Sequence, residues 1–265
     1  MDKIPSGADA VAPSLTEKLS VLAERLIGTG MELSQDNQNR LLAFLTILTN
    51  YNQKVNLVGN CDPHHLIERH TVDGLTLVSR IRSELAEAKA AGHRLRYLDI
   101  GTGGGLPGMI VALSCPELAT TLMDATQKKC TFLQFAIDQL GLAEQIEVVN
   151  GRAEEMARES QFRERYKFVT ARAVGTLKLT AELAIPFLRP GGLFLAQKTK
   201  SRIDAEIKES KDLLINIGAE IEAIQEVEKL GQFEELKEAL IVPVLKRHTT
   251  PLKYPREWKL ISPTK

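Results

Sequence analysis

The sequence is poor in cysteine, and the few cysteines form no recognisable framework. Cys61, Cys115 and Cys130 stand far apart, with no C-x-x-C pair and no zinc-ligand spacing. An odd number of isolated thiols argues against a secreted protein held together by disulfides. We therefore expect a cytoplasmic protein without a bound structural metal.

Long hydrophobic runs and an excess of one charge are also missing. No stretch approaches the roughly 18 apolar residues that span a bilayer, so no membrane partner is expected. Lys and Arg total 34, as do Asp and Glu, and this balance does not indicate a nucleic-acid partner. The balance shifts near the end, where residues 246–265 carry six Lys or Arg and one Glu.

The length of 265 residues fits one large domain, or one domain with an appendage. Residues 1–13 lack the pattern of a signal peptide and are expected to form a flexible tail. Residues 14–92 show leucines at helical spacing without a strand pattern, which predicts a helical N-terminal extension. A domain of alternating strands and helices should occupy residues 93–247, and residues 248–265 should form a basic C-terminal tail.

The alternating region predicts an α/β sheet. Strands are expected at 96–100, 119–124, 146–150, 168–171, 193–197, 220–226 and 239–245. Helices should follow the first five strands, at 107–114, 127–140, 153–159, 175–187 and 202–217. The last two strands are joined by a loop without a convincing helix, so they should run antiparallel. Five parallel strands and this terminal pair give a seven-stranded sheet.

The glycine-rich segment LDIGTGGGLPG, at residues 98–108, indicates a ligand site. An apolar run enters it, and Pro107 with an apolar series leaves it, as in a strand–turn–helix unit. Glycines permit positive φ angles and let a ligand approach the backbone. A turn of this kind after a first parallel strand binds nucleotides. The same glycines satisfy the dinucleotide pattern G-x-G-x-x-G, so the type of nucleotide stays open.

Two acidic residues bear on that choice. Asp124 ends the second expected strand, where a carboxylate accepts hydrogen bonds from ribose hydroxyls, although it could also cap the following helix. Asp99 lies two residues before the first glycine, a position typical of sites for ligands with a positive centre. S-adenosylmethionine, with its sulfonium, amino group and adenosine, suits such a site. A dinucleotide-dependent oxidoreductase is the alternative, but the sheet ends without a second mononucleotide unit.

Residues 98–108 closely resemble the motif LD(V/I)G(T/S)GxGLPG of the bacterial 16S rRNA guanine-N7 methyltransferases, the family called ribosomal RNA small subunit methyltransferase G or glucose-inhibited division protein B. Further segments resemble that family: YNQKVNL at 51–57, RHTVDGL at 69–75, LMDATQKKCTFL at 122–133, GRAEE at 151–155, ARAV at 171–174 and PLKYPR at 251–256. The chain departs from the family at Gly74, at Gln197-Lys198-Thr199 and after Arg256, where Glu257-Trp258-Lys259-Leu260 replaces a Gly-x-Pro segment.

The resemblance implies a Rossmann-like (class I) methyltransferase fold and S-adenosyl-L-methionine as the cofactor. By position in the motifs, Gly101 and Leu106 would line the cofactor pocket, and Asp124 would hold the ribose. Ala153 and Glu154 would border the adenine. Two of these residues have plain structural alternatives, since Leu106 could be a packing residue and Glu154 an ordinary exposed acid.

Arg172 is the catalytic residue that the resemblance implies, beside both the methionine part of the cofactor and the incoming base. Its alternative role is that of a structural ion-pair partner. Guanine N7 carries an in-plane lone pair and needs no general base, so catalysis is mostly positioning. The segment Thr170-Ala171-Arg172-Ala173 fits this chemistry, because it lacks the Pro-Pro-aromatic motif typical of enzymes that methylate exocyclic amines.

RNA contact is expected from basic residues around the pocket mouth, and the partner that the resemblance implies is 16S rRNA or the small ribosomal subunit during assembly. The candidates are Lys54, Arg69, Lys128, Lys129, Arg172, Lys198, Lys200, Arg202 and the basic tail. His70 is expected to be a satisfied histidine of the helical extension rather than an RNA contact. The protein should act as a monomer. A non-catalytic RNA-binding relative is the remaining alternative, against which the intact glycine turn argues.

Overall fold

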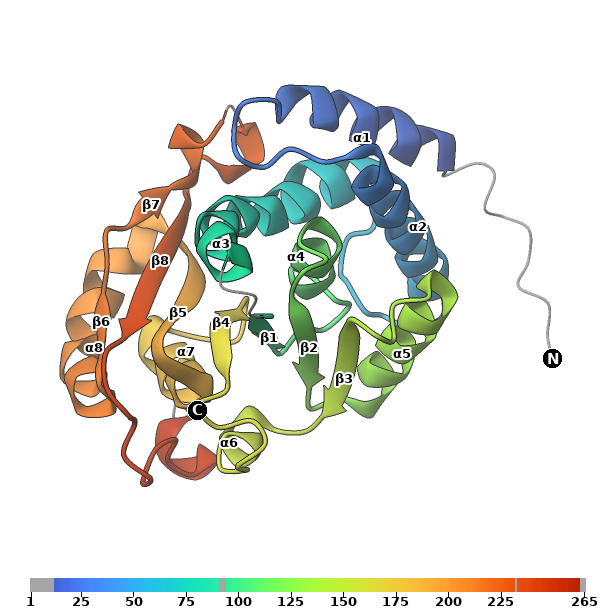
Figure 1. Ribbon diagram of the computed structural model, residues 1–265. Coiled ribbons are helices and arrows are strands. Elements are labelled where there is room, and N and C mark those ends of the chain that lie inside the picture. Colours follow the sequence, from blue (N-terminus) through green and yellow to red (C-terminus); the bar gives the residue numbers. More distant parts are fainter. Residues whose placement is uncertain (1–11, 91–93, 232, 263–265) are drawn as a thin grey trace.

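The computed structural model of the protein describes residues 12–90, 94–231 and 233–262, and its centre is an eight-stranded sheet (Figure 1). The strand order is β3-β2-β1-β4-β5-β8-β6, with β7 also paired to β8. The strands are β1 (Arg96–Ile100), β2 (Ala119–Asp124), β3 (Ile146–Asn150), β4 (Tyr166–Ala171), β5 (Leu188–Thr199), β6 (Ala219–Ile221), β7 (Gln225–Glu226) and β8 (Ala239–Lys246). The first five are parallel and β8 is antiparallel to its neighbours, which confirms the predicted arrangement.

The predicted count of seven strands was wrong by one, because the strand expected at 220–226 is interrupted. Its two pieces, β6 and β7, both pair with β8, on either side of Pro243. The Glu222 amide donates to the Pro243 carbonyl at 2.9 Å, so the same edge of Pro243 faces this strand. Proline has no N–H to return the bond, and the ladder breaks there.

Helices cover both faces of the sheet (Figure 1). They are α1 (Ala12–Arg25), α2 (Gln35–Asn52), a π-helical turn (His65–Thr71), α3 (Val72–Ala90), α4 (Gly108–Ser114), α5 (Gln127–Leu140), α6 (Ala153–Met156), α7 (Leu177–Ala184), α8 (Ile203–Ile217) and α9 (Trp258–Ile261). Short 3-10 turns lie at Ile185–Phe187, Lys200–Arg202, Val227–Lys229 and Glu234–Leu236. The expected tail at 1–13 lies almost wholly outside the described residues, and α1 already begins at Ala12.

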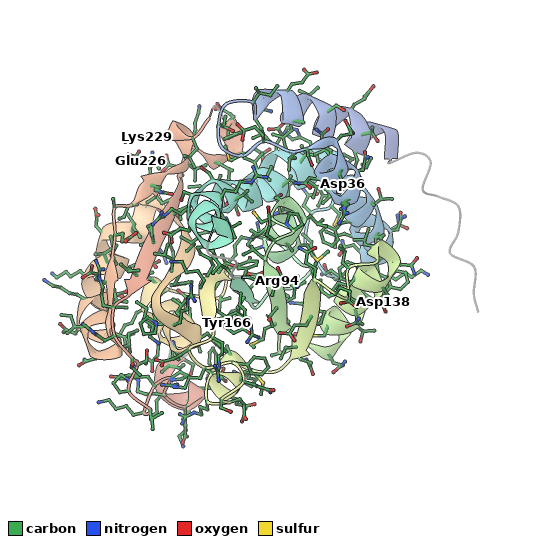
Figure 2. The ribbon with its side chains drawn as sticks, in the orientation of Figure 1. Asp36, Arg94, Asp138, Tyr166, Glu226 and Lys229 are labelled. Atoms are coloured by element: carbon green, nitrogen blue, oxygen red, sulfur yellow. The ribbon has the colours of Figure 1, made fainter. Side chains whose placement is uncertain are left out.

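Alternation along the strands divides the interior into two cores. Tyr97 and Phe168 belong to the core shared with α1 to α5, whereas Leu98 and Val169 belong to the core shared with α7 and α8. The N-terminal helices therefore pack onto one face of the sheet. Figure 2 shows buried Tyr166 in β4, while exposed Asp36 and Asp138 lie on α2 and α5.

The strand order places a crevice between β1 and β4. From β1 the chain passes through α4 to β2 and then β3 on one side, whereas β4 leads through α7 to β5 on the other side. Ligands of open α/β sheets bind at such a switch point, outside the carboxyl ends of the strands. The glycine turn after β1 and the segment after β4 both lie there.

Candidate functional site

The glycine turn takes backbone conformations that side chains would oppose. Gly101, Gly103 and Gly105 have φ angles of 65°, 60° and 86°, in the left-handed region. At Gly108, the first residue of α4, a Cβ would lie 2.7 Å from Oδ2 of Asp99. The glycines therefore serve both the turn and the packing beneath it.

Asp99 is fully buried and fastens the turn to the sheet. Its Oδ2 accepts a hydrogen bond from the Gly108 amide at 3.0 Å, and its Oδ1 accepts one from the Thr170 hydroxyl at 2.6 Å. The Tyr97 hydroxyl lies 2.7 Å from the same Thr170 oxygen. Burial raises the pKa of Asp99 to about 6, although the hydrogen bond from Thr170 opposes the shift. Both carboxylate oxygens are thus engaged within the protein, which makes Asp99 a positioning residue for the glycine turn.

Asp124 connects the same turn to the next strand. Its Oδ2 accepts from the Gly103 amide at 2.9 Å, and its Oδ1 accepts from the Thr126 amide at 2.8 Å. The Lys129 ammonium lies 3.8 Å from Oδ2. Thr126 is the N-cap of α5, so Asp124 supports the start of the helix without being the capping residue itself. A carboxylate has about four acceptor positions, and these bonds leave capacity for a ligand.

A cavity of about 130 Å³ lies against Asp124. Four of the six residues predicted to bind the cofactor line it: Gly101, Asp124, Ala153 and Glu154. The remaining lining residues are Ile100, Met123, Ala125, Gly151, Arg152, Val174 and Trp258. The wall therefore comes from the segments at the carboxyl ends of β1, β2 and β3, with single contributions from Val174 after β4 and from Trp258 in the C-terminal segment.

Glu154 is buried and forms an ion pair with Nε of Arg152, so the alternative of an ordinary exposed acid is wrong. Leu106 is also buried, but it belongs to the core under α1 to α5 and does not line the cavity. The structure therefore favours the packing role for Leu106, and its contact with a cofactor stays a prediction.

Arg172 lies outside the cavity wall, just after β4. Its Nη1 donates to Oδ2 of Asp73 in α3 at 2.9 Å, so the predicted alternative of an ion pair is present. Gln197 of β5 donates through Nε2 to the Asp73 carbonyl at 2.8 Å. Sequence reasoning missed Asp73 as a partner, although it lies within the RHTVDGL segment. We call Asp73, Arg172, Gln197 and the neighbouring His70 the strand-four cluster.

The strand-four cluster contains polar atoms without partners. His70 Nδ1 and Gln197 Oε1 are buried and have no hydrogen-bond partner among the described residues. The expectation of a satisfied histidine was therefore wrong. Burial lowers the pKa of His70 to about 3, and the positive charge of Arg172 adds to the shift. The imidazole is therefore neutral near pH 7, within the electrostatic influence of the Arg172 guanidinium.

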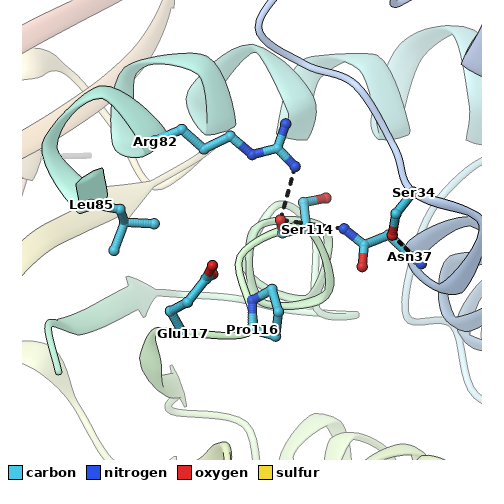
Figure 3. A pocket seen from close by; sticks show the side chains of 7 residues that line it. All are labelled: Ser34, Asn37, Arg82, Leu85, Ser114, Pro116 and Glu117. Atoms are coloured by element: carbon cyan, nitrogen blue, oxygen red, sulfur yellow. Dashed lines mark hydrogen bonds between the residues drawn. The ribbon is translucent and has the colours of Figure 1, made fainter. Parts of the chain in front are cut away.

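A second cavity, of about 400 Å³, is lined by residues from the start of α2, from α3 and from the connection between α4 and β2 (Figure 3). Arg82 Nη2 donates to the Ser114 carbonyl at 3.0 Å, and Asn37 Nδ2 approaches the same oxygen at 3.4 Å. Ser34 caps α2 by accepting from the Asn37 amide. These bonds tie α2 and α3 to the end of α4 that is remote from the glycine turn.

The basic residues predicted to contact RNA fall into two groups. Lys54, Lys128 and Arg202 are exposed. The others form internal contacts: Arg69 with the Glu235 carbonyl, Lys129 with Asp124, Arg172 with Asp73, Lys198 with Glu206, and Lys200 with Glu226 and Glu228. In the tail region, Lys246 is buried against Glu164 and Arg256 pairs with Glu182. Figure 2 labels Glu226 and Lys229, and Glu226 pairs with Lys229 as well as with Lys200.

Two negative findings concern metals and membranes. Within 12–90, 94–231 and 233–262, no group of three or more His, Cys, Asp or Glu is arranged to hold a metal ion. Over the same residues, no helix combines the length and the apolar character needed to span a bilayer.

Comparisons with known proteins agree with the geometry. The family profile described as rRNA small subunit methyltransferase G matches residues 37–233. Two proteins named Ribosomal RNA small subunit methyltransferase G are similar over most of their length. The one from Caldanaerobacter subterraneus subsp. tengcongensis is 34% identical, over 92% of this chain and 97% of its own. The one from Desulfitobacterium hafniense is 37% identical, over 86% of this chain and 88% of its own.

Solved structures share the fold at much lower identity. An O-methyltransferase from Bacillus cereus in complex with SAH has a TM-score of 0.54 at 16% identity, over 89% of this chain and all (100%) of that one. A putative O-methyltransferase from Klebsiella pneumoniae has a TM-score of 0.53 at 12% identity, over 88% of this chain and 100% of that one. The fold is thus the predicted Rossmann-like methyltransferase fold, and the oxidoreductase alternative has no support. From the family profile and its relatives, this chain belongs to the ribosomal RNA small subunit methyltransferase G family.

Proposed function

We propose that this protein transfers a methyl group from S-adenosyl-L-methionine to N7 of one guanine in 16S rRNA, in the cytoplasm and as a monomer. The observation that carries the proposal is the cavity at the carboxyl ends of β1, β2 and β3. There Asp124 and Glu154 line the same cavity as Gly101 of the glycine turn, in a chain of this family. The acceptor is RNA by family membership, and N7 is the position that the family resemblance implies. The segment Thr170-Ala171-Arg172-Ala173 supports it, because it lacks the Pro-Pro-aromatic motif of enzymes that methylate exocyclic amines.

The residues of the cavity fit the cofactor. The carboxylate of Asp124 is already oriented by two backbone amides and retains acceptor capacity for the ribose hydroxyls. Gly101 offers backbone without a side chain, and Ala153 and Glu154 border the place for the adenine. When bound, S-adenosylmethionine supplies a methyl group on a sulfonium, which is reactive towards a neutral nitrogen nucleophile.

The strand-four cluster fits the base. Guanine presents O6 as an acceptor beside N7, and an arginine can donate to O6 while the lone pair of N7 stays free. Arg172 donating to O6 would align N7 for attack on the methyl carbon without removing a proton, and alignment alone accounts for large rate enhancements. Asp73 would keep the guanidinium oriented until the base arrives. The exposed residues Lys54, Lys128 and Arg202 would contact phosphates.

The experiment is methylation with labelled S-adenosylmethionine and rRNA that lacks the modification. We expect one labelled methyl per rRNA molecule, released as 7-methylguanine on chemical cleavage of the strand. Free 16S rRNA and isolated small subunits should be compared, since both are candidate substrates. Methylation of an exocyclic amine, or failure to methylate any RNA, would refute the proposal.

A further inference from the structure

The segment 250–261 folds back onto the domain and is held there by three arginines. Arg163 donates to the carbonyls of Thr250 and Tyr254 at 2.8 and 2.9 Å, and Arg158 donates to that of Pro255 at 2.7 Å. Arg256 in turn donates through two of its nitrogens to the carboxylate of Glu182, in α7. This segment was expected to be a basic tail for RNA. Its contacts instead fix it beside α6, where Figure 1 shows it.

The fixed segment delivers Trp258 to the cofactor cavity. Trp258 begins α9 and lines the cavity together with Asp124, Ala153 and Glu154. The guanidinium of Arg152 lies over its ring, 4.8 Å from the centroid, and the same arginine pairs with Glu154. Although 39% exposed, the indole is therefore held in place by a stacked cation that also orients a carboxylate of the cavity.

We propose that Trp258 forms the outer wall of the cofactor cavity and packs against the adenine. The inference rests on the proposed function, because it takes S-adenosylmethionine as the ligand. Asp124, Ala153 and Glu154 all line the cavity. By the family resemblance, Asp124 at the end of β2 would hold the ribose, and Ala153 and Glu154 after β3 would border the adenine. Trp258 is the aromatic residue in the wall at that end. An indole covers the apolar face of a purine without a hydrogen-bond requirement, so the wall would accept the adenine of S-adenosylmethionine and of S-adenosylhomocysteine alike.

The size of the effect follows from stacking. Substituting an aromatic side chain that stacks on a nucleobase lowers the affinity roughly five- to hundredfold. We expect a loss of affinity in the lower part of this range, because Trp258 would cover only one face of the adenine and its indole is partly exposed. We expect Trp258→Ala to weaken binding of S-adenosylmethionine about tenfold, and Trp258→Phe to weaken it less than about threefold.

The chain reports on this contact by itself, because it contains one tryptophan. Titration of the full-length protein with S-adenosylmethionine or S-adenosylhomocysteine, without RNA, should quench the Trp258 emission to saturation. The midpoint should equal the dissociation constant from calorimetry. Leu260→Ala is the matched control, since Leu260 lies on the same helix, is 61% exposed and does not line the cavity. That variant should bind the cofactor as the unmodified protein does. Thermal unfolding of each variant shows whether the fold is retained.

The outcomes separate this inference from the proposed function. Unchanged cofactor affinity in Trp258→Ala, with no emission change in the unmodified protein at saturation, would overturn the inference alone. A raised KM for rRNA with unchanged cofactor affinity would also overturn it, and would assign α9 to RNA. If the protein binds the cofactor with quenching but methylates no rRNA, the proposed function fails while the role of Trp258 stands. If calorimetry detects no cofactor binding, both fail.

Discussion

The two sides of the crevice are constructed differently. On the cofactor side, the carboxylates of Asp99 and Asp124 accept hydrogen bonds from backbone amides of Gly108, Gly103 and Thr126. On the acceptor side, the strand-four cluster depends on side chains from α3, β4 and β5. It contains two buried polar atoms without partners among the described residues, whereas the glycine turn on the cofactor side contains one, Thr102 Oγ1.

This difference indicates which side is ready for its ligand. Backbone amides are fixed by the fold, so the cofactor side is preorganised and should change little on binding. An unpaired buried polar atom costs free energy, and a ligand or rearrangement that pairs it recovers that cost. We therefore expect the acceptor side to rearrange when RNA binds, with Arg172 exchanging Asp73 for the base. The following predictions test this contrast.

The largest effect is expected at Arg172. Arg172→Ala should lower the rate of methyl transfer by about a hundredfold or more, because a misaligned acceptor loses most of the positioning advantage. Cofactor affinity should change less than about threefold, since Arg172 lies outside the cavity wall. Single-turnover kinetics and calorimetry measure the two quantities. Arg189→Ala, at an exposed arginine near the amino end of β5, serves as the control. Equal losses in rate and cofactor affinity would show that Arg172 belongs to the cofactor side.

Substitution of Asp124 should affect cofactor affinity more than the transfer rate, which is the reverse of the expectation for Arg172. Asp124→Asn replaces one charged acceptor oxygen by a donor that faces a backbone amide, so we expect cofactor affinity to fall at least about tenfold. The transfer rate at saturating cofactor should fall much less. Calorimetry and initial rates over a range of cofactor concentrations test this. Asp138→Asn changes an exposed acid on the helix that follows and should have no effect. A loss confined to the saturated rate would contradict the assignment of Asp124.

Asp99 should make folding stability depend on pH. Its folded pKa, about 6, lies above its unfolded value, so the folded state takes up the proton first. Its contribution to stability is greatest at low pH and is lost as pH rises through about 6. Relative to Asp99→Asn, the unmodified protein should gain on the order of 1 kcal/mol between pH 7 and pH 5. Urea unfolding of both proteins at the two pH values tests this, and parallel changes would refute it.

His70, on the acceptor side, should make folding stability depend on pH in the direction opposite to that of Asp99. Its folded pKa, about 3, lies below the unfolded value of 6.5, so its contribution is present above pH 6.5 and is lost as pH falls. Because the ring is partly exposed, we discount the effect to less than about 1 kcal/mol between pH 7 and pH 5. His70→Asn should remove this acid sensitivity in the same unfolding measurement. A variant that remains equally acid-sensitive would show that His70 is not the responsible group.

Much of the cofactor side was predictable from local sequence. The bounds of β1, β2, β3 and α5 agree with the expectation, because apolar alternation and helical spacing are short-range signals. The glycine turn and Asp124 lie at the ends of those elements, so their meeting follows from parallel strands. The functional roles of the site residues stay predictions.

The remaining features depend on contacts between distant segments. Arg172 and Asp73 are 99 residues apart, and the position of Trp258 depends on Arg152 and on the arginines that hold its segment. The break between β6 and β7 arises from Pro243 in a neighbouring strand. No local pattern carries such information, and a charged tail is equally consistent with free solvation and with internal ion pairs.

The contact between Asp99 and Gly108 has a consequence for how substitutions accumulate. A side chain at position 108 would meet Leu122 at 2.5 Å and the Asp99 carboxylate at 2.7 Å, whereas loss of that carboxylate would leave the Gly108 amide unpaired. Neither position can therefore change alone without harm. The last glycine of the LDIGTGGGLPG segment is constrained by the interior of the protein, and a mutational scan should find it intolerant even when cofactor binding is not selected.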